Sequence, residues 1–213
     1  MHHIAVIDYG MGNLRSVSKA LEAVSNNASV VVTSDPKTIL SASHVLFPGV
    51  GAIRDCMAGL KQLELEEVIL QATQEKPFLG ICLGMQALLS HSEENNGVDT
   101  LNLFSGSVKL FRPDASVNGE KLKVPHMGWN QVHQTCSHPL WKNIEQNSRF
   151  YFVHSFYAEP TDKAVIAGTS AYPDDFAAAL YKDNIFAAQF HPEKSQRAGL
   201  QLLENFVNWD GQS

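Results

Sequence analysis

Short apolar runs alternate with helical spacing of apolar residues through the first 95 residues. Runs bounded by Asp, Gly or Pro predict strands at Ile4–Ile7, Ser29–Thr33, Val45–Phe47 and Pro77–Ile81. Helical spacing lies between them, over Leu14–Val24, over Leu60–Ile69 and from Gly84 to Leu89. Asn13 fits the N-cap of the first helix. This alternation predicts a central, mostly parallel sheet with helices on both faces.

After about Asn95 the pattern changes to strands without obvious helices between them. These strands are predicted at Val108–Phe111, Phe150–Val153, Ala164–Gly168 and Ile185–Phe190. We expect them to be antiparallel additions to the same sheet, with a final helix over Gly199–Trp209. Residues 112–120 are expected to form a loop. With no repeat or linker, the fold class is α/β, as a single domain spanning 1–213.

Composition limits the kinds of partner. A chain of 213 residues buries roughly 70% of its unfolded surface and needs no disulfide or metal staple. The net charge is −6 and no Lys/Arg run occurs. We therefore expect no nucleic acid and no membrane surface, because both need clustered cations. A small molecule or another protein is the expected partner.

Cysteine and histidine spacing argues against cofactors. Three scattered cysteines form no C-x-x-C pair, and their odd number favours a reducing, cytoplasmic compartment. No metal is expected, because five histidines lack a second donor at ligand spacing and are assigned to surface or structural positions: His2, His44, His91, His133 and His138. Gly10-Met11-Gly12 starts a dinucleotide fingerprint that fails at Arg15. No cofactor is expected.

A cysteine stands between a predicted strand and a predicted helix. Gly80, Cys82 and Gly84 form the pattern G-x-C-x-G, a thiol version of the nucleophile elbow. Glycines on both sides let the chain turn tightly and let the helix approach the strand. An isolated cysteine is more often an inert buried residue. The two glycines favour a nucleophile instead.

A histidine ends the predicted strand Ile185–Phe190. His191 is followed two residues later by Glu193, and an extended backbone would put both side chains on one face. A carboxylate on one ring nitrogen leaves the other nitrogen for a thiol. Alone, His-Pro-Glu is typical of a polar turn; together with the cysteine elbow it predicts a catalytic base and its orienter.

A third motif, Pro48-Gly49-Val50-Gly51, follows another predicted strand. Backbone N–H groups of such a loop can bind an oxyanion, and a simple tight turn explains the glycines equally well. All three motifs are predicted at the carboxyl ends of strands, where open α/β sheets bind ligands.

Together, P-G-V-G, G-I-C-L-G-M-Q and F-H-P-E resemble the class I glutamine amidotransferase family, over about Ile4 to Trp209. The resemblance implies a flavodoxin-like fold and a thioester route to glutamate and ammonia. It implies that Cys82 attacks the glutamine amide, His191 relays the proton and Glu193 orients His191. It also implies oxyanion donors and substrate contacts at Gly49, Val50, Gly51, Leu83, Gln86, His154, Ser155 and Phe156.

Further segments resemble one group within that family. Asp8–Asn13, Pro125–Asn130 (P-H-M-G-W-N) and His191–Ser195 are similar to members that pass ammonia to a (β/α)8-barrel cyclase subunit in histidine biosynthesis. The resemblance implies a heterodimer with Asn13, Trp129 and Lys194 at the partner interface. Each also has an ordinary interpretation, as helix cap, core aromatic and solvated charge.

Three other functions remain open at this point. One is a glutaminase subunit for another synthase, such as those making anthranilate or pyridoxal phosphate, against which P-H-M-G-W-N argues. Another is a cysteine peptidase, which needs an open groove. The last is an inactive partner-binding module, which the complete Cys/His/Glu set disfavours.

Overall fold

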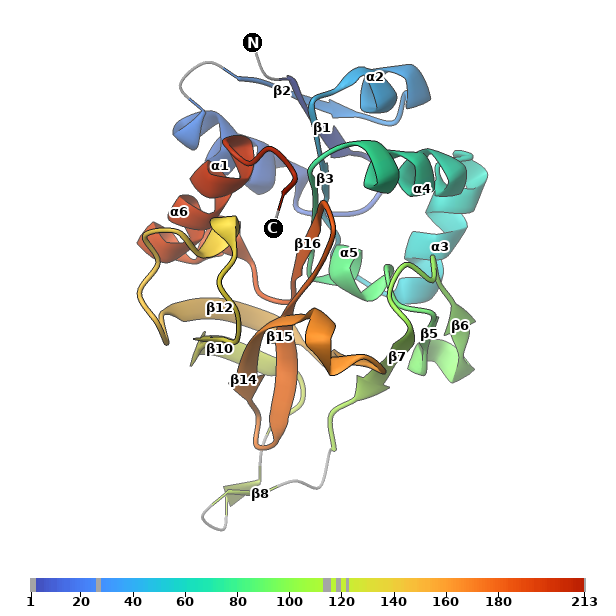
Figure 1. Ribbon diagram of the computed structural model, residues 1–213. Helices are drawn as coiled ribbons and strands as arrows, with labels where there is room; N and C mark the ends of the chain where they lie inside the picture. Colours follow the sequence, from blue (N-terminus) through green and yellow to red (C-terminus); the bar gives the residue numbers. More distant parts are fainter. Residues whose placement is uncertain (1–2, 26–27, 113–115, 118–119, 122, 213) are drawn as a thin grey trace.

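The computed structural model describes residues 3–25, 28–112, 116–117, 120–121 and 123–212. Its centre is a long sheet with strand order β2-β1-β3-β4-β16-β15-β13-β7-β5-β6 (Figure 1). The first five strands in this order run parallel to one another: β2 (Ser29–Thr33), β1 (His3–Ile7), β3 (His44–Phe47), β4 (Phe78–Ile81) and β16 (Ile185–Ala188). The parallel sheet predicted from the alternating pattern is therefore confirmed.

Helices cover both faces of the parallel strands (Figure 1). On one face, α1 (Leu14–Val24) and α6 (Gln196–Val207) pack with Ile4 and Val6 of β1 in one hydrophobic core. The other face carries a second core with Ala5 and Ile7. Its helices are α2 (Pro36–Ser41), α3 (Ile53–Gln62), α4 (Glu66–Glu75) and α5 (Leu83–Gln86). Alternate side chains of β1 thus enter opposite cores, as strand geometry requires.

The second half of the chain extends the sheet by antiparallel pairing. β15 (Asp175–Lys182) pairs antiparallel with β16 and β13 (Phe156–Pro160), and β13 pairs antiparallel with β7 (Gly106–Leu110). β14 (Ile166–Ala171) pairs antiparallel with both β15 and β11 (His133–Gln134). Beyond β7 lie β5 (His91–Ser92), which is parallel to β7, and β6 (Val98–Asp99), which is antiparallel to β5. The antiparallel pairing predicted for the strands at Val108 and Ala164 is confirmed by β7 with β13 and by β14 with β15.

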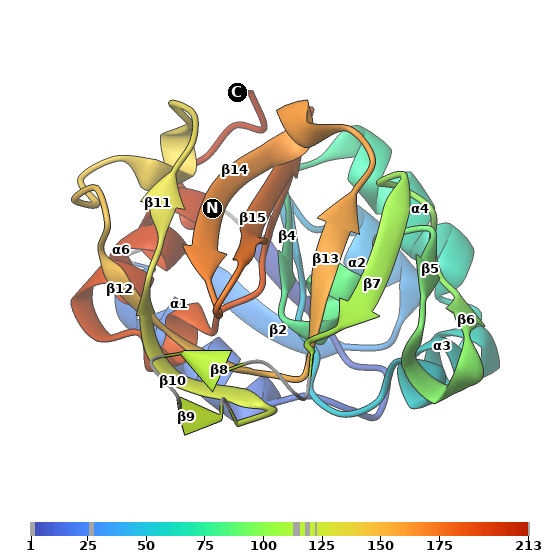
Figure 2. The same cartoon turned by 90° about the horizontal axis from the view of Figure 1, so that it is seen from below.

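Two of the predicted additions pair differently from expectation. The strand at Ile185, β16, pairs in parallel with β4, the strand that leads to Cys82, with Ala188 opposite Ile81. The strand at Phe150 is outside the main sheet: β12 (Arg149–His154) pairs antiparallel with β10 (His126–Gln131) in a separate two-stranded ribbon. Figure 2 shows this ribbon on the side of the molecule opposite β7 and β5. Apolar alternation predicts a strand but does not identify its partner.

Several predicted boundaries were also wrong. The helix expected over Leu60–Ile69 is two helices, α3 and α4, separated at Glu64, whose φ is 55°. Leu60, Leu65 and Ile69 are all buried, so the apolar spacing continues across a break in the backbone. The strand expected at 164–168 starts as a 3-10 turn, Lys163–Val165. Other 3-10 turns are Glu94–Asn96, Pro139–Trp141 and Pro192–Lys194.

The expected loop over residues 112–120 contains part of a small hairpin, β8 (Ser116–Val117) with β9 (Glu120–Lys121). Residues 113–115 and 118–119 lie outside the described residues, so the rest of that prediction is not tested. At the first helix, Asn13 precedes Leu14 as expected, but its side chain makes no capping hydrogen bond within the described structure.

Glycine at position 84 is required by the close approach of α5 to β3. A Cβ at Gly84 would lie 2.0 Å from the carbonyl oxygen of Phe47. This contact is with backbone, which cannot move aside as a flexible side chain can. The turn at Cys82 is therefore held against the neighbouring strand β3.

We predict that Gly84→Ala lowers the free energy of unfolding by about 3 kcal/mol or more, because overpacking against backbone forces α5 away from β3. Gly10→Ala is the matched control: Gly10 has a φ of +87°, but no atom lies within 4 Å of the place that an added Cβ would take. That variant should cost about 1 kcal/mol, for the positive φ alone. Urea unfolding of both variants checks this, and equal losses would contradict the packing argument.

Candidate active site

Cys82 ends β4 in an unusual backbone conformation. Its φ is 55° and its ψ is −108°, and its N–H donates to the carbonyl oxygen of Ala188 at 2.7 Å. The side chain is 6% exposed. α5 begins at the next residue, as the elbow pattern predicted. The bond to Ala188 ties the candidate nucleophile to β16, the strand that leads to His191.

His191 and Glu193 lie together beside this elbow. His191 Nδ1 and Glu193 Oε1 are 2.9 Å apart, and the two side chains are 2% and 0% exposed. His191 donates its backbone N–H to Tyr151 O, and its carbonyl accepts from Ser195 Oγ. The route differs from the one predicted: Glu193 sits in the 3-10 turn Pro192–Lys194 and not on an extended backbone. The turn still brings the carboxylate to the ring.

The electrostatics of His191 favour its charged form. Burial lowers the pKa of His191, but the attraction of Cys82 and Glu193 outweighs burial and raises the pKa to about 10. No hydrogen bond occupies Nε2 among the described residues, which leaves that atom for the Cys82 sulfur. The charged His191 imidazolium therefore lies beside the sulfur of the candidate nucleophile.

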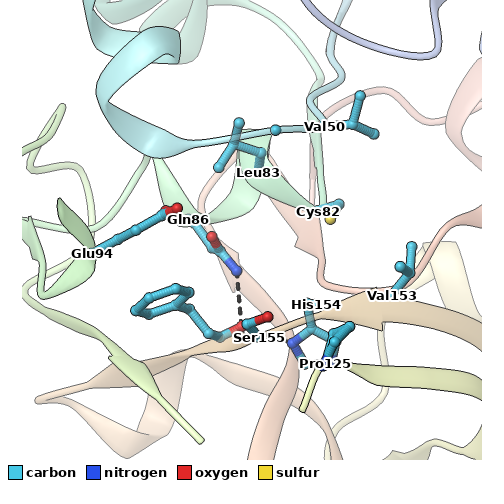
Figure 3. Close-up of a pocket in the computed structure, with 11 residues that line it drawn as sticks. Val50, Cys82, Leu83, Gln86, Glu94, Pro125, Val153, His154 and Ser155 are labelled. Atoms are coloured by element: carbon cyan, nitrogen blue, oxygen red, sulfur yellow. Dashed lines mark hydrogen bonds between the residues drawn. The ribbon is translucent and has the colours of Figure 1, made fainter.

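A cavity of about 290 Å³ opens at Cys82 (Figure 3). Eight residues singled out from the sequence line it: Val50, Gly51, Cys82, Leu83, Gln86, His154, Ser155 and Phe156. Gly49, His191 and Glu193 are not among the described lining residues. The cavity is at the small end of ligand pockets, which run from roughly 300 to 1,000 Å³, and it suits a molecule of amino-acid size.

Sequence reasoning missed three further lining residues, Glu94, Pro125 and Val153. Figure 3 shows Glu94 at one end of the pocket, away from Cys82. Its carboxylate accepts a hydrogen bond from the backbone N–H of Ile53 at 3.1 Å. Glu93 and Glu94 are adjacent in a polar segment, and no spacing rule separates the one that enters the pocket from the other.

Gln86 is held at the floor of the pocket by two acceptors. Its Nε2 donates to the carbonyl oxygen of Phe156 at 2.9 Å (the dashed line in Figure 3) and to Gln189 Oε1 at 3.0 Å. Gln189, which is fully buried, donates from its own Nε2 to Cys82 Sγ at 3.6 Å. Gln189 was also missed, although a single amide within the apolar strand Ile185–Phe190 was a signal.

The glycine loop lies directly above the elbow. The backbone N–H of Leu83 donates to the carbonyl oxygen of Gly49 at 3.4 Å. A Cβ at Gly49 would lie 2.6 Å from the Tyr9 hydroxyl and 2.7 Å from Leu83 Cβ, and Gly51 has a φ of +108°. Both glycines are therefore required by the conformation. One candidate oxyanion donor, Leu83 N–H, faces a loop carbonyl in this state.

The three candidate interface residues lie outside the pocket. Trp129 is 38% exposed and contacts the edge of Tyr151, over whose ring Lys194 Nζ lies at 5.9 Å. Asn13 stands at the start of α1. In the described part of the chain, no group of three His, Cys, Asp or Glu is arranged to hold a metal, and no helix is long and apolar enough to cross a membrane.

The chain is similar to known proteins over nearly its whole length. Residues 5–209 match the model of the family described as glutamine amidotransferase class-I. The chain is 59% identical to the imidazole glycerol phosphate synthase subunit HisH of Methylococcus capsulatus, over 99% of this chain and 98% of the relative. The HisH subunit of Nitrosococcus oceani is 58% identical over the full length of both chains.

Solved structures share the fold at low sequence identity. The structure of PurLQS from Thermotoga maritima matches with a TM-score of 0.74 and 18% identity, over 97% of this chain and 98% of that one. A glutamine amidotransferase from the same organism matches with a TM-score of 0.60 and 20% identity, over 92% of this chain and 78% of that one.

We predict that Cys82 is alkylated by iodoacetamide at pH 7 faster than Cys136, whose pKa is raised by burial, and faster than Cys56, whose pKa burial raises to about 12. Because His191 keeps its proton up to a pKa of about 10, the effect should persist across pH 6–9. His191→Asn should slow alkylation of Cys82 by about tenfold or more, since it removes the positive charge.

Peptide mapping by mass spectrometry measures all three cysteines in one sample, and Cys136 is the internal control. Equal Cys82 rates in the unchanged protein and in His191→Asn would contradict the proposed imidazolium partner.

Proposed function

The chain belongs to the class I glutamine amidotransferase family, and from this we propose that it is the glutaminase subunit of an imidazole glycerol phosphate synthase. It hydrolyses glutamine to glutamate and ammonia and passes the ammonia to a cyclase subunit in histidine biosynthesis. One observation carries the catalytic part of the proposal: a buried His191–Glu193 pair beside Cys82 at the wall of a small cavity.

In the proposed reaction, Cys82 Sγ attacks the side-chain amide carbon of glutamine. The His191 imidazolium donates its proton to the departing nitrogen, so ammonia leaves and a γ-glutamyl thioester remains. The neutral imidazole then takes a proton from water, which attacks the thioester and releases glutamate and the thiolate. Glu193 holds the ring through Nδ1 during both proton transfers, as an orienting carboxylate does in related triads.

We further propose how the pocket holds glutamine. Glu94 is the one carboxylate among the described lining residues, and it suits the α-ammonium group of an amino acid. Gln86 and the backbone at Ser155 and Phe156 supply hydrogen-bonding groups for the rest of the molecule. A cavity of about 290 Å³ argues against the peptidase alternative, which needs an extended groove.

The proposed partner is the cyclase subunit of imidazole glycerol phosphate synthase, a (β/α)8 barrel, in a heterodimer. The names of the full-length relatives, which are subunits of that synthase, support a second subunit. Asn13, Trp129 and Lys194 are proposed to face it.

We also propose a cytoplasmic location, which three unpaired cysteines support. A single folding domain over 1–213 is proposed as well, and two cores that share one sheet support it.

The glycine loop provides a means of control. The carbonyl that accepts from Leu83 belongs to the peptide plane between Gly49 and Val50. Rotating that plane would turn the carbonyl away and point the Val50 N–H toward the same region, freeing Leu83 N–H as well. Since losing one oxyanion donor costs about 10²–10³ in rate, this rotation is sufficient to switch hydrolysis on.

We predict that Cys82→Ala abolishes glutamine hydrolysis but leaves synthesis from added ammonia by the assembled complex largely intact, because ring closure belongs to the other subunit. Cys136→Ala is the matched control and should retain both activities. Glutamate release and cyclase turnover are measured on the same complexes. If the correctly assembled Cys82→Ala complex lost both activities, the assignment of the nucleophile would be wrong.

We also predict slow hydrolysis by the isolated chain and an increase of about 10²–10³ when the cyclase and its ligand are bound, because the loop must rotate to form the oxyanion site. Glutamine turnover is compared for the chain, the complex, and the complex with a cyclase substrate analogue. Equal rates in all three would remove the loop mechanism and leave the glutaminase assignment standing.

A further inference from the structure

Two buried histidines, His154 in the pocket lining and His126 next to it, form hydrogen bonds whose direction is fixed. His154 Nδ1 lies 2.7 Å from the carbonyl oxygen of Phe156, which can only accept. His154 therefore carries its proton on Nδ1. Because the ring is neutral, Nε2 must be an acceptor. Burial in particular keeps the ring neutral, lowering the pKa of His154 to about 3.

The second histidine donates to the first. His126 Nδ1 lies 3.0 Å from His154 Nε2, so the proton of His126 is also on Nδ1. Its own Nε2 then accepts from Asn130 Nδ2 at 3.4 Å. The Asn130 amide is oriented independently, since Nδ2 donates to Ala171 O and Oδ1 accepts from the N–H of Gln131. The hydrogen bonds therefore all run in one direction, with Asn130 donating to His126, His126 to His154 and His154 to the Phe156 carbonyl.

The ring of His126 is locked in place by aromatic neighbours. It stacks on Phe152 at 5.0 Å and on Tyr172 at 4.1 Å between ring centroids. Its side chain is 4% exposed, and burial lowers its pKa to about 4. The stacked ring cannot rotate freely, and it stays neutral at neutral pH. A displacement of His126 would therefore be passed on to its hydrogen-bond partner His154.

This series of hydrogen bonds ends at the candidate active site. The Phe156 carbonyl that accepts from His154 also accepts from Gln86 Nε2, which in turn bonds to Gln189, the residue that donates to Cys82 Sγ. The other end is on β10, where His126 and Asn130 point inward and Met127 and Trp129 are exposed at 62% and 38%. We call this series of hydrogen bonds, from Asn130 through His126 and His154 to the Phe156 carbonyl and Gln86, the relay. Strand β10 therefore carries one end of the relay and an outward surface.

We propose that His126 and His154 are positioning residues: their hydrogen-bonded pair fixes the Phe156 carbonyl and Gln86 in the pocket and links strand β10 mechanically to the glutamine site. The proposal rests on the glutaminase function proposed above. Neither histidine exchanges a proton with the substrate; each acts through the wall of the pocket.

The first test is the tautomer of each ring. We expect ¹⁵N-resolved NMR of the assembled protein at pH 7 to show protonated Nδ1 and bare Nε2 for both His126 and His154. Free neutral histidine prefers the other tautomer, so the result would not arise without these bonds. Assignment uses His126→Asn and His154→Asn samples. Protonated Nε2 on either ring would overturn the relay.

The second test is kinetic and is made on the complex with the cyclase. His126→Leu should raise the KM for glutamine and lower kcat/KM about tenfold or more, because a displacement of the substrate-binding groups by about 1 Å is costly. His126→Asn keeps a donor near the Nδ1 position and should restore kcat/KM to within about threefold. His138→Leu is the matched control.

His138 is a suitable control because it too is 4% exposed, has a pKa lowered to about 4 by burial, and packs against Phe186 and Trp209. It makes no bond to the relay within the described structure. Equal KM increases for His126→Leu and His138→Leu, or no rescue by His126→Asn, would overturn the proposal. If the unchanged complex failed to hydrolyse glutamine, the proposed function would fail instead, and the tautomers would still test the relay.

Discussion

Cys82 holds a backbone conformation, φ 55° and ψ −108°, that residues with a side chain reach only when their surroundings enforce it. Strain of this kind costs about 1–3 kcal/mol. Two contacts enforce it here: the 2.7 Å bond from Cys82 N–H to Ala188 O, and the approach of Gly84 to the Phe47 carbonyl. β3 and β16, the strands on either side of β4, thus fix where the sulfur sits. The other parts of the site are arranged around that point.

The charge arrangement follows from this placement. Since β16 lies parallel to β4 with Ala188 opposite Ile81, the chain leaves β16 beside the elbow and reaches His191 three residues later. Its partner, Glu193, has a fully buried side chain. Buried ion pairs contribute little to stability, because desolvation offsets their attraction. The pair is better explained by chemistry: it keeps a proton on His191 next to the sulfur at neutral pH.

The sequence predicted the parts of this site that depend on local backbone chemistry. Gly80 and Gly84 around Cys82 indicated a tight turn, and the apolar run ending at His191 indicated a strand end. It could not predict that the strand at Phe150 leaves the main sheet to pair with β10, because pairing partners depend on contacts distant in sequence. Glu94 and Gln189 were missed because their places in the site depend on contacts with residues distant in sequence. Glu94 lies across the pocket from Cys82, and Gln189 lies between Gln86 and the Cys82 sulfur.

The pocket therefore has two walls of different origin. One wall is the elbow and glycine loop, built on parallel strands and held by backbone contacts. The other is the β10–β12 ribbon, in which His126 stands opposite His154 and Met127 opposite Val153. Strand alternation gives the ribbon an inner face with the two histidines and an outer face with Met127 and Trp129. Val153, which is paired with Met127 and so shares its face of the ribbon, lines the pocket together with His154 of the other face. The ribbon is outside the main sheet but is tied to the site, because Tyr151 O accepts the backbone N–H of His191. This wall therefore positions both the candidate base and part of the pocket lining.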